Sequence, residues 1–129
     1  MIQITVIPMT KPLLILIAGP YRSGTGGDPA LISQNLARLE EASGPIFRLG
    51  HVPMIGEWVA LPVLRTVDPE AAAEGDVMYE TARRLLQHCD AVLRLPGESS
   101  GADKDVEIAQ QLGLLVYRSL DEVPTASTP

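Results

Sequence analysis

The fold is decided by one stretch of sequence, Pro12-Leu-Leu-Ile-Leu-Ile-Ala-Gly-Pro-Tyr-Arg-Ser-Gly24. Its first half is a short, continuous apolar run, which is typical of a strand buried on both faces of a parallel sheet. Its second half opens a glycine-rich turn that extends to Gly27. Asp28 and Pro29 then predict the start of a helix, with Asp28 as the N-cap and Pro29 at the first helical position. The sequence from Pro12 onward therefore predicts a strand, a polar loop and a helix.

The same alternation continues along the chain. The first helix is expected to end at Ser43-Gly44-Pro45, and an apolar loop or short helix is expected at 53–61. Further strands are expected at 46–52, 90–96 and 114–117, and further helices at 76–89 and 103–112. Strands that alternate with helices form parallel sheets with right-handed crossovers. We therefore predict an α/β fold: a single-domain, three-layer sandwich with a parallel, flavodoxin-like or Rossmann-like sheet of four or five strands.

The ends of the chain are expected to lie outside this sandwich. Residues 1–11 are interpreted as an N-terminal arm or an edge strand, because Pro8 interrupts their apolar run. Residues 12–118 are interpreted as the domain itself. Residues 119–129 are interpreted as a C-terminal tail, whose Pro, Ser and Thr content after Val123 predicts fraying.

Composition limits the kinds of partner. The chain has 129 residues, of which 46% are hydrophobic and 20% charged, as in ordinary globular domains. Its net charge of −6 argues against nucleic acid and acidic membranes, which bind basic surfaces. The single cysteine, Cys89, fits a reducing compartment and a packing role, and the apolar run at 13–18 is too short to span a membrane. We expect a cytoplasmic protein whose partner is a small molecule.

Two loops are expected at one edge of the sheet, because the carboxyl ends of parallel strands meet there and ligands bind there. The first loop offers Gly19, the Arg22 guanidinium and the Ser23 hydroxyl ahead of a helix N-terminus. Backbone N–H groups, a helix dipole and an arginine are the components of an anion site. The alternative is that these glycines only reverse the chain.

The second loop carries Ser99, Ser100 and Gly101 directly before a helix. The hydroxyl groups of the two serines are expected to lie beside the first loop, which favours a shared binding site. The alternative is that a serine here only caps the helix. The glycine spacing of the first loop matches neither a P-loop nor a dinucleotide fingerprint, and His51 has no His or Cys partner at ligand spacing. No cofactor and no metal are expected.

Carboxylates follow the second loop at alternating positions. Asp103 and Glu107 share one face of the expected helix, and Asp105 lies on the other. One face is expected to point toward the sheet edge, unless all three carboxylates only complement the helix dipole. Trp58, the single tryptophan, either stacks on a ligand, covers a subunit interface or packs in the core.

The order of several motifs resembles the nucleoside 2-deoxyribosyltransferase superfamily, in particular a branch of small bacterial members. That superfamily also contains nucleoside 5′-monophosphate N-glycosidases. The resemblance covers roughly residues 12–118. It is carried by Leu14-Ile-Leu-Ile-Ala-Gly-Pro-Tyr-Arg22, Gly50-His-Val-Pro53, Leu86-Gln-His-Cys-Asp-Ala-Val-Leu-Arg-Leu-Pro96, Ser99-Ser-Gly-Ala102, Glu107-Ile-Ala109 and Leu112-Gly-Leu-Leu-Val116.

The resemblance implies cleavage or transfer at an N-glycosidic bond of a nucleoside or nucleotide. It implies that a carboxylate on the helix after the second loop acts at the anomeric carbon, a position that falls on Asp105, with Glu107 as a substitute only in a shifted register. Leu16 stands at the family's strand tyrosine, although Tyr21 lies close by, and Ala82 stands at its helix aspartate.

The binding half of the family's pattern is better preserved than the catalytic half. Arg22, Ser23, Ser99 and Gly101 match in kind the residues that hold the 5′-phosphate. A nucleotide-binding homologue that no longer catalyses is therefore an alternative. A homo-oligomer is expected, both from the family and from the apolar segment 54–64.

Overall fold

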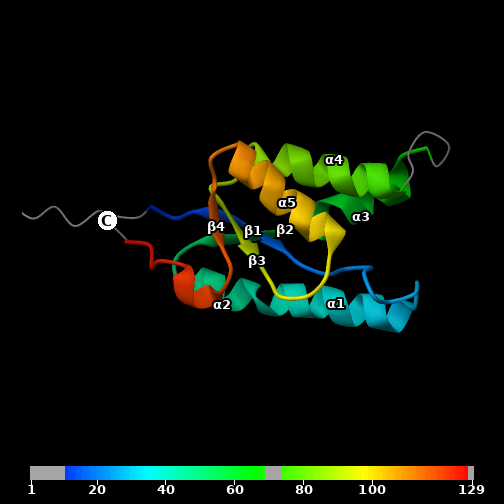
Figure 1. Cartoon of the computed structure of the whole chain (residues 1–129), viewed down its shortest axis with the longest axis horizontal. Helices are drawn as coiled ribbons and strands as arrows, with labels where there is room; N and C mark the ends of the chain where they lie inside the picture. The colour runs from blue at the N-terminus through cyan, green and yellow to red at the C-terminus, as the bar shows by residue number, and fades with distance from the viewer. Residues whose placement is uncertain (1–10, 69–73, 128–129) are drawn as a thin grey trace, which may run out of the picture.

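The computed structural model describes residues 11–68 and 74–127 (Figure 1). Four parallel strands form one sheet in the order β2-β1-β3-β4. The strands are β1 (Leu14–Ala18), β2 (Val52–Ile55), β3 (Ala91–Arg94) and β4 (Leu115–Tyr117). The helices are α1 (Pro29–Glu41), α2 (Ser43–Arg48), α3 (Gly56–Thr66), α4 (Glu74–Leu86), α5 (Ser100–Gln111) and the short 3₁₀ helix η1 (Leu120–Glu122). The predicted α/β fold with a parallel sheet is confirmed.

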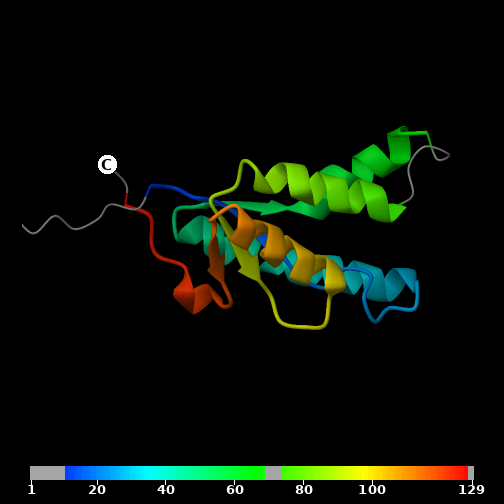
Figure 2. The same ribbon diagram turned by 45° about the horizontal axis from the view of Figure 1, so that its top comes forward.

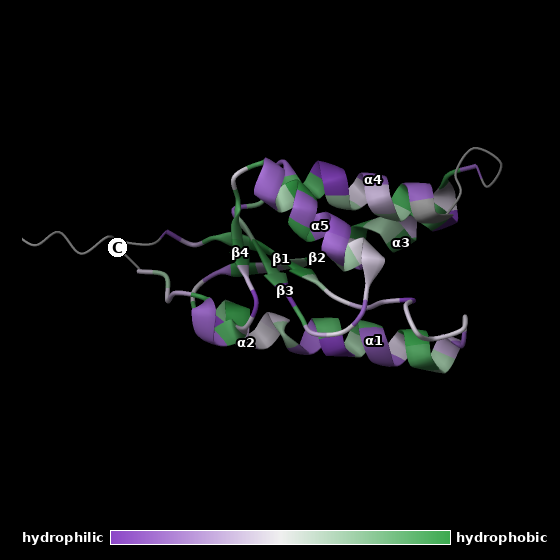
Figure 3. Cartoon of the chain, in the orientation of Figure 1, coloured by the Kyte–Doolittle hydropathy of each residue, from purple (hydrophilic) through white to green (hydrophobic). Residues whose placement is uncertain are grey.

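The helices cover both faces of the sheet and so complete the three layers. Helices α1 and α2 lie on one face, and α3, α4 and α5 lie on the other (Figures 1 and 2). Strand β1 supplies both cores, because successive side chains point to opposite faces. Ile15 and Ile17 pack toward α1 and α2, whereas Leu16 and Ala18 pack toward α4 and α5. Figure 3 shows the corresponding pattern, in which apolar strands lie between helices that carry both hydrophilic and hydrophobic residues.

The strand order places a crevice at the carboxyl end of β1. The chain leaves β1 to form β2 on one side, then crosses back to form β3 on the other side. Leu16 is aligned with Met54 of β2 and with Val92 of β3, so β1 is central. Connections diverge from this point, which is where parallel α/β sheets bind their ligands. The expected adjacency of the loops after β1 and β3 follows from this order.

The predicted start of the first helix is confirmed. Asp28 is the N-cap of α1, and its carboxylate accepts a hydrogen bond from the Ala30 N–H at 2.9 Å. Pro29 occupies the first helical position, where its missing N–H costs nothing. Before it, Gly24, Gly26 and Gly27 have φ values of 73°, 59° and 81°, which side chains with a Cβ rarely adopt.

The predicted second strand at 46–52 is wrong. Residues Ser43–Arg48 form α2, and β2 begins only at Val52. Ile46 is fully buried in the core as part of that helix. A short apolar run does not by itself distinguish a strand from a buried helix. The apolar segment after β2 is helical and longer than expected, because α3 extends to Thr66.

The segment beyond β4 is anchored rather than frayed as far as residue 127. His51 is buried and accepts a hydrogen bond from the Leu13 N–H at its Nδ1, so its Nε2 donates to the Pro124 carbonyl. The Ala126 N–H donates to the Leu49 carbonyl at 2.7 Å. His51 therefore joins the start of β1 to the C-terminal segment. The predicted arm or edge strand at 1–11 falls, up to residue 10, outside the described residues.

Candidate functional site

A cavity of about 560 Å³ opens at the carboxyl end of β1. Its floor is formed by β1 itself, and its walls come from the loop after β1, the first turn of α3, the face of α4 and the first turns of α5. The residues that line it are Leu16, Ile17, Ala18, Gly19, Tyr21, Arg22, Ser23, Gly56, Glu57, Asp76, Met78, Tyr79, Ala82, Ser99, Ser100, Gly101, Ala102, Lys104 and Asp105. Four separate stretches of the sequence thus contribute to one cavity.

The two predicted loops are in contact. Gly97 has a φ of 118°, and a Cβ at this residue would lie 2.7 Å from Pro20 Cγ. Gly19 is equally confined, since a Cβ there would lie 3.0 Å from Leu39 Cδ2. Glycine at both positions lets the loops approach closely. This contact brings the donors of the two loops to the same cavity.

The second loop is fixed by a buried arginine. Arg94, the last residue of β3, donates from its guanidinium to the carbonyls of Leu95 and Gly97 and to Asp103 at 2.9 Å. Asp103 lies in the first turn of α5, so one side chain connects the strand, the loop and the helix. Arg94 thereby holds the loop and the first turn of α5 against the carboxyl end of β3.

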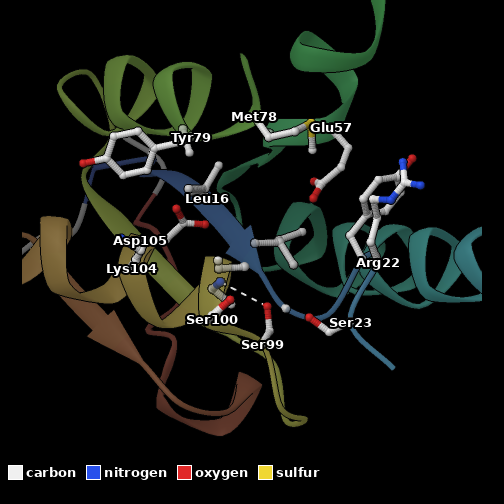
Figure 4. A pocket seen from close by; sticks show the side chains of 18 of the residues that line it. Leu16, Arg22, Ser23, Glu57, Met78, Tyr79, Ser99, Ser100, Lys104 and Asp105 are labelled. Carbon is white, nitrogen blue, oxygen red and sulfur yellow. Dashed lines mark hydrogen bonds between the residues drawn. The ribbon is translucent and has the colours of Figure 1, made fainter. Parts of the chain in front are cut away.

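Ser99 has the capping role that was one of its two predicted alternatives. It is buried, and its Oγ accepts a hydrogen bond from the Ala102 N–H at 3.1 Å (Figure 4). Its hydroxyl proton can still be donated toward a ligand, because a hydroxyl is both donor and acceptor. Ser100 and Gly101 follow in the first turn of α5, where backbone N–H groups have no partner within the helix. Capping and ligand binding are therefore compatible at this loop.

The first loop is ordered by its own polar contacts. Thr25 is buried and donates from its hydroxyl to the Arg22 carbonyl at 2.6 Å. Asn35 on α1 donates from its side-chain amide to the Tyr21 carbonyl at 2.8 Å. Tyr21, Arg22 and Ser23 all line the cavity, and Figure 4 shows Arg22 and Ser23 on the wall away from Asp105. The predicted residues of both loops thus line the same cavity.

Asp105 is the carboxylate of α5 that lines the cavity. It is half-buried beside the apolar floor, and its pKa is raised from an ordinary 3.8 to about 7. The largest cause is burial, followed by the negative charge of Glu57, while Arg94 lowers the pKa. A carboxyl group that titrates near neutral pH can serve acid, base or nucleophilic chemistry, and such groups are concentrated at functional sites.

Glu57 is a second carboxylate of the cavity, which the sequence did not predict. It lies in the first turn of α3, directly after β2. Burial raises its pKa, and a backbone hydrogen bond partly opposes that rise. Figure 4 shows Glu57 and Asp105 pointing into the cavity from opposite sides, with Leu16 between them. An acidic residue directly after a strand would have been the signal, but the sequence placed that strand at 46–52 rather than at Val52–Ile55.

Two residues predicted for the site lie elsewhere. Glu107 is exposed on α5 and does not line the cavity. Trp58 is also outside it: the residue is 39% exposed, and its Nε1 donates to the Glu40 carboxylate at 2.9 Å. Core packing of Trp58 is therefore wrong, and stacking on a ligand in this cavity is not supported.

Leu16 and Ala82, the positions that the resemblance aligns with a tyrosine and an aspartate, do face the cavity. Leu16 and Ala82 both line it, and both are buried. They make its floor and one wall apolar beneath the two carboxylates. Asp76 and Tyr79, both exposed, contribute the polar groups of α4 instead, and Lys104 lies 5.5 Å from the centre of the Tyr79 ring. The cavity thus combines an apolar floor with an acidic pair and a rim of donors.

Across residues 11–68 and 74–127, no cluster of His, Cys, Asp and Glu has the arrangement needed to hold a metal ion. None of the helices described there has the length and apolar character to cross a membrane. Cys89 is buried, and burial together with the charge of Asp90 raises the pKa of its thiol to about 11, which fits packing rather than reactivity.

Comparison with known proteins adds no assignment. The chain matches no protein-family model, and no curated protein matches it in sequence.

Proposed function

We propose that the protein cleaves or transfers the N-glycosidic bond of a nucleoside or nucleoside 5′-monophosphate. The observation that carries this proposal is the half-buried Asp105 carboxylate, whose pKa is about 7, above an apolar floor and beside two loops of hydrogen-bond donors. The resemblance of the motif order supports the same chemistry. The volume of about 560 Å³ is in the range of small-molecule sites.

The sugar is proposed to bind between the two loops and Asp105. The 5′ end, with its phosphate where present, lies against Arg22, Ser23 and the first turn of α5 around Ser100. Helix N-termini and guanidinium groups favour this anionic group. The anomeric carbon then faces Asp105, which stabilises or attacks the positive charge that develops there. Neither the binding of the 5′ end nor the action of Asp105 at the anomeric carbon requires a metal or a cofactor.

The test is release of free base. Purified protein is incubated at high concentration with the common ribonucleosides, deoxyribonucleosides and their 5′-monophosphates, with and without a second base as acceptor. Chromatography then measures free base and exchanged nucleoside. Release or exchange that disappears in Asp105→Asn supports the proposal, and absence of both with every substrate overturns it.

A second candidate is a nucleotide-binding protein without turnover. It is favoured by Leu16 and Ala82, which place apolar side chains where the related enzymes carry catalytic polar ones. Calorimetry with the same nucleotides separates the candidates. Binding without base release supports this second function, and absence of binding removes both.

A further inference from the structure

We propose that Glu57 is a second catalytic residue, which donates the proton that the departing base requires; this inference rests on the proposed function. Glu57 begins α3 directly after β2 and enters the cavity from the wall opposite α5 (Figure 4). A sugar held above Leu16 with its anomeric carbon toward Asp105 has its base on the Glu57 side. The position of Glu57 therefore corresponds to the leaving group rather than to the sugar.

The other polar groups of the cavity fit this role less well. Asp76 and Tyr79 are exposed on the rim of α4, and the Lys104 amine lies over the Tyr79 ring at 5.5 Å. Arg22 lies on the wall formed by the first loop, where the proposed function places the 5′ end of the substrate. Glu57 is half-buried in the wall of the cavity, and burial raises the pKa of its carboxyl group, so it holds a proton more readily than an exposed glutamate does.

The reaction balances with these two carboxyl groups alone. In the first step an Asp105 oxygen bonds to the anomeric carbon, the bond from carbon to base nitrogen breaks, and that nitrogen takes the proton of Glu57. In the second step water attacks the anomeric carbon and the bond to Asp105 breaks. The proton of the water returns to Glu57. With a second base as acceptor, its nitrogen replaces the water.

The two carboxyl groups hold protons more readily than exposed carboxyl groups do. Burial raises the pKa of both, and the charge of Glu57 raises that of Asp105 further, whereas Arg94 lowers it. Two interacting carboxyl groups titrate as a pair, so ionisation of one favours the protonated form of the other. The division of roles therefore rests on position, because Glu57 enters the cavity from the wall opposite Asp105. Asp76, Lys104 and Arg22 are the other charged groups of the cavity.

The experiment compares leaving groups. Glu57→Gln and Asp105→Asn are assayed on the best natural substrate and on the 4-nitrophenyl glycoside of the same sugar, whose nitrophenolate departs without a proton. We expect Glu57→Gln to lower kcat on the natural substrate by about 100-fold or more, but on the nitrophenyl glycoside by less than about fivefold. Asp105→Asn is expected to lower kcat on both. Circular dichroism establishes that each variant is folded.

Glu57→Ala is a second variant, in which added formate is expected to restore turnover of the natural substrate. Equal losses on both substrates in Glu57→Gln overturn the role of Glu57. A loss selective for the natural substrate in Tyr21→Phe instead assigns the proton to Tyr21 and overturns it as well. If the wild-type protein acts on neither substrate, the proposed function fails first, and this inference falls with it.

Discussion

Glu57 and Asp105 face one another across the apolar floor of a single cavity, and the charge of Glu57 raises the pKa of Asp105 (Figure 4). The two residues are far apart in sequence and belong to different helices. Strand order brings them together, because α3 follows β2 and α5 follows β3 on either side of β1. An acidic pair held in this way is costly for stability, as is typical of functional sites.

Asp105→Asn is expected to stabilise the protein at alkaline pH. The unfolded chain releases this proton near pH 3.8, whereas the folded protein retains it up to about pH 7. The stability that the protonated form provides is therefore complete below about pH 4 and is lost as pH rises to 7. At pH 8 we expect the variant to gain about 1 kcal/mol or more in free energy of unfolding, measured with urea.

Glu107→Gln is the matched control, because Glu107 lies exposed on the same helix outside the cavity. Its free energy of unfolding should change by less than about 0.5 kcal/mol both at about pH 4 and at about pH 8. An equal gain in both variants at pH 8 would mean that the net charge of the chain, not the burial of Asp105, is responsible.

Glu57→Gln is expected to lower the pKa of Asp105 below its value of about 7, because the charge of Glu57 is the second largest cause of the rise. Burial remains, so the pKa should stay above the ordinary 3.8. The carboxyl ¹³C shift of Asp105, followed by NMR between pH 3 and pH 9, measures both values. An unchanged midpoint would show that the two carboxyl groups do not interact.

The sequence predicted the parts of the fold that local patterns determine. The buried strand β1, the Asp28 cap and the Pro29 start of α1 each depend on neighbouring residues only. Parallel pairing then followed from the alternation of strands and helices, and it placed the two loops together. The assignment at 46–52 failed because the burial of Ile46 depends on packing against distant residues, which a short apolar run does not encode.

The candidate site was predictable on one side only. Glycines, serines and Arg22 after the strands are visible as local motifs, and the helical period assigned Asp105 and Glu107 to different faces. Glu57 was missed because its role depends on the start of β2, which the sequence placed several residues too early. The anchoring of the C-terminal segment by His51 was equally invisible, since it joins residues that are far apart in the chain.

Under the proposed function, Asp105→Asn is expected to lower base release by about 100-fold or more, because it removes the charge that the proposal places at the anomeric carbon. Glu107→Gln should retain at least about half of the wild-type rate, since Glu107 lies outside the cavity. Initial rates on one substrate measure both variants. A larger loss in Glu107→Gln than in Asp105→Asn would assign the chemistry to the other face of α5.

Arg94→Met is expected to destabilise the protein by about 2–3 kcal/mol, because the carbonyls of Leu95 and Gly97 lose their donor. Asp103→Ala removes only one partner, whose side chain is 70% exposed, and should cost less than about 1 kcal/mol. Urea unfolding measures both. Similar losses in the two variants would show that the ion pair, rather than the bonds to the loop, carries the effect of Arg94.

Gly97→Ala is expected to destabilise the protein by about 1–3 kcal/mol, because its φ of 118° is strained for a side chain with a Cβ. The added Cβ would also lie 2.7 Å from Pro20 Cγ and force the two loops apart. Nucleotide affinity, measured by calorimetry, should fall with the stability. Gly44→Ala is the control: a Cβ there meets open space in α2, so stability should be unchanged or rise by up to about 1 kcal/mol. Wild-type affinity in a destabilised Gly97→Ala would contradict the view that contact between the loops forms the binding site.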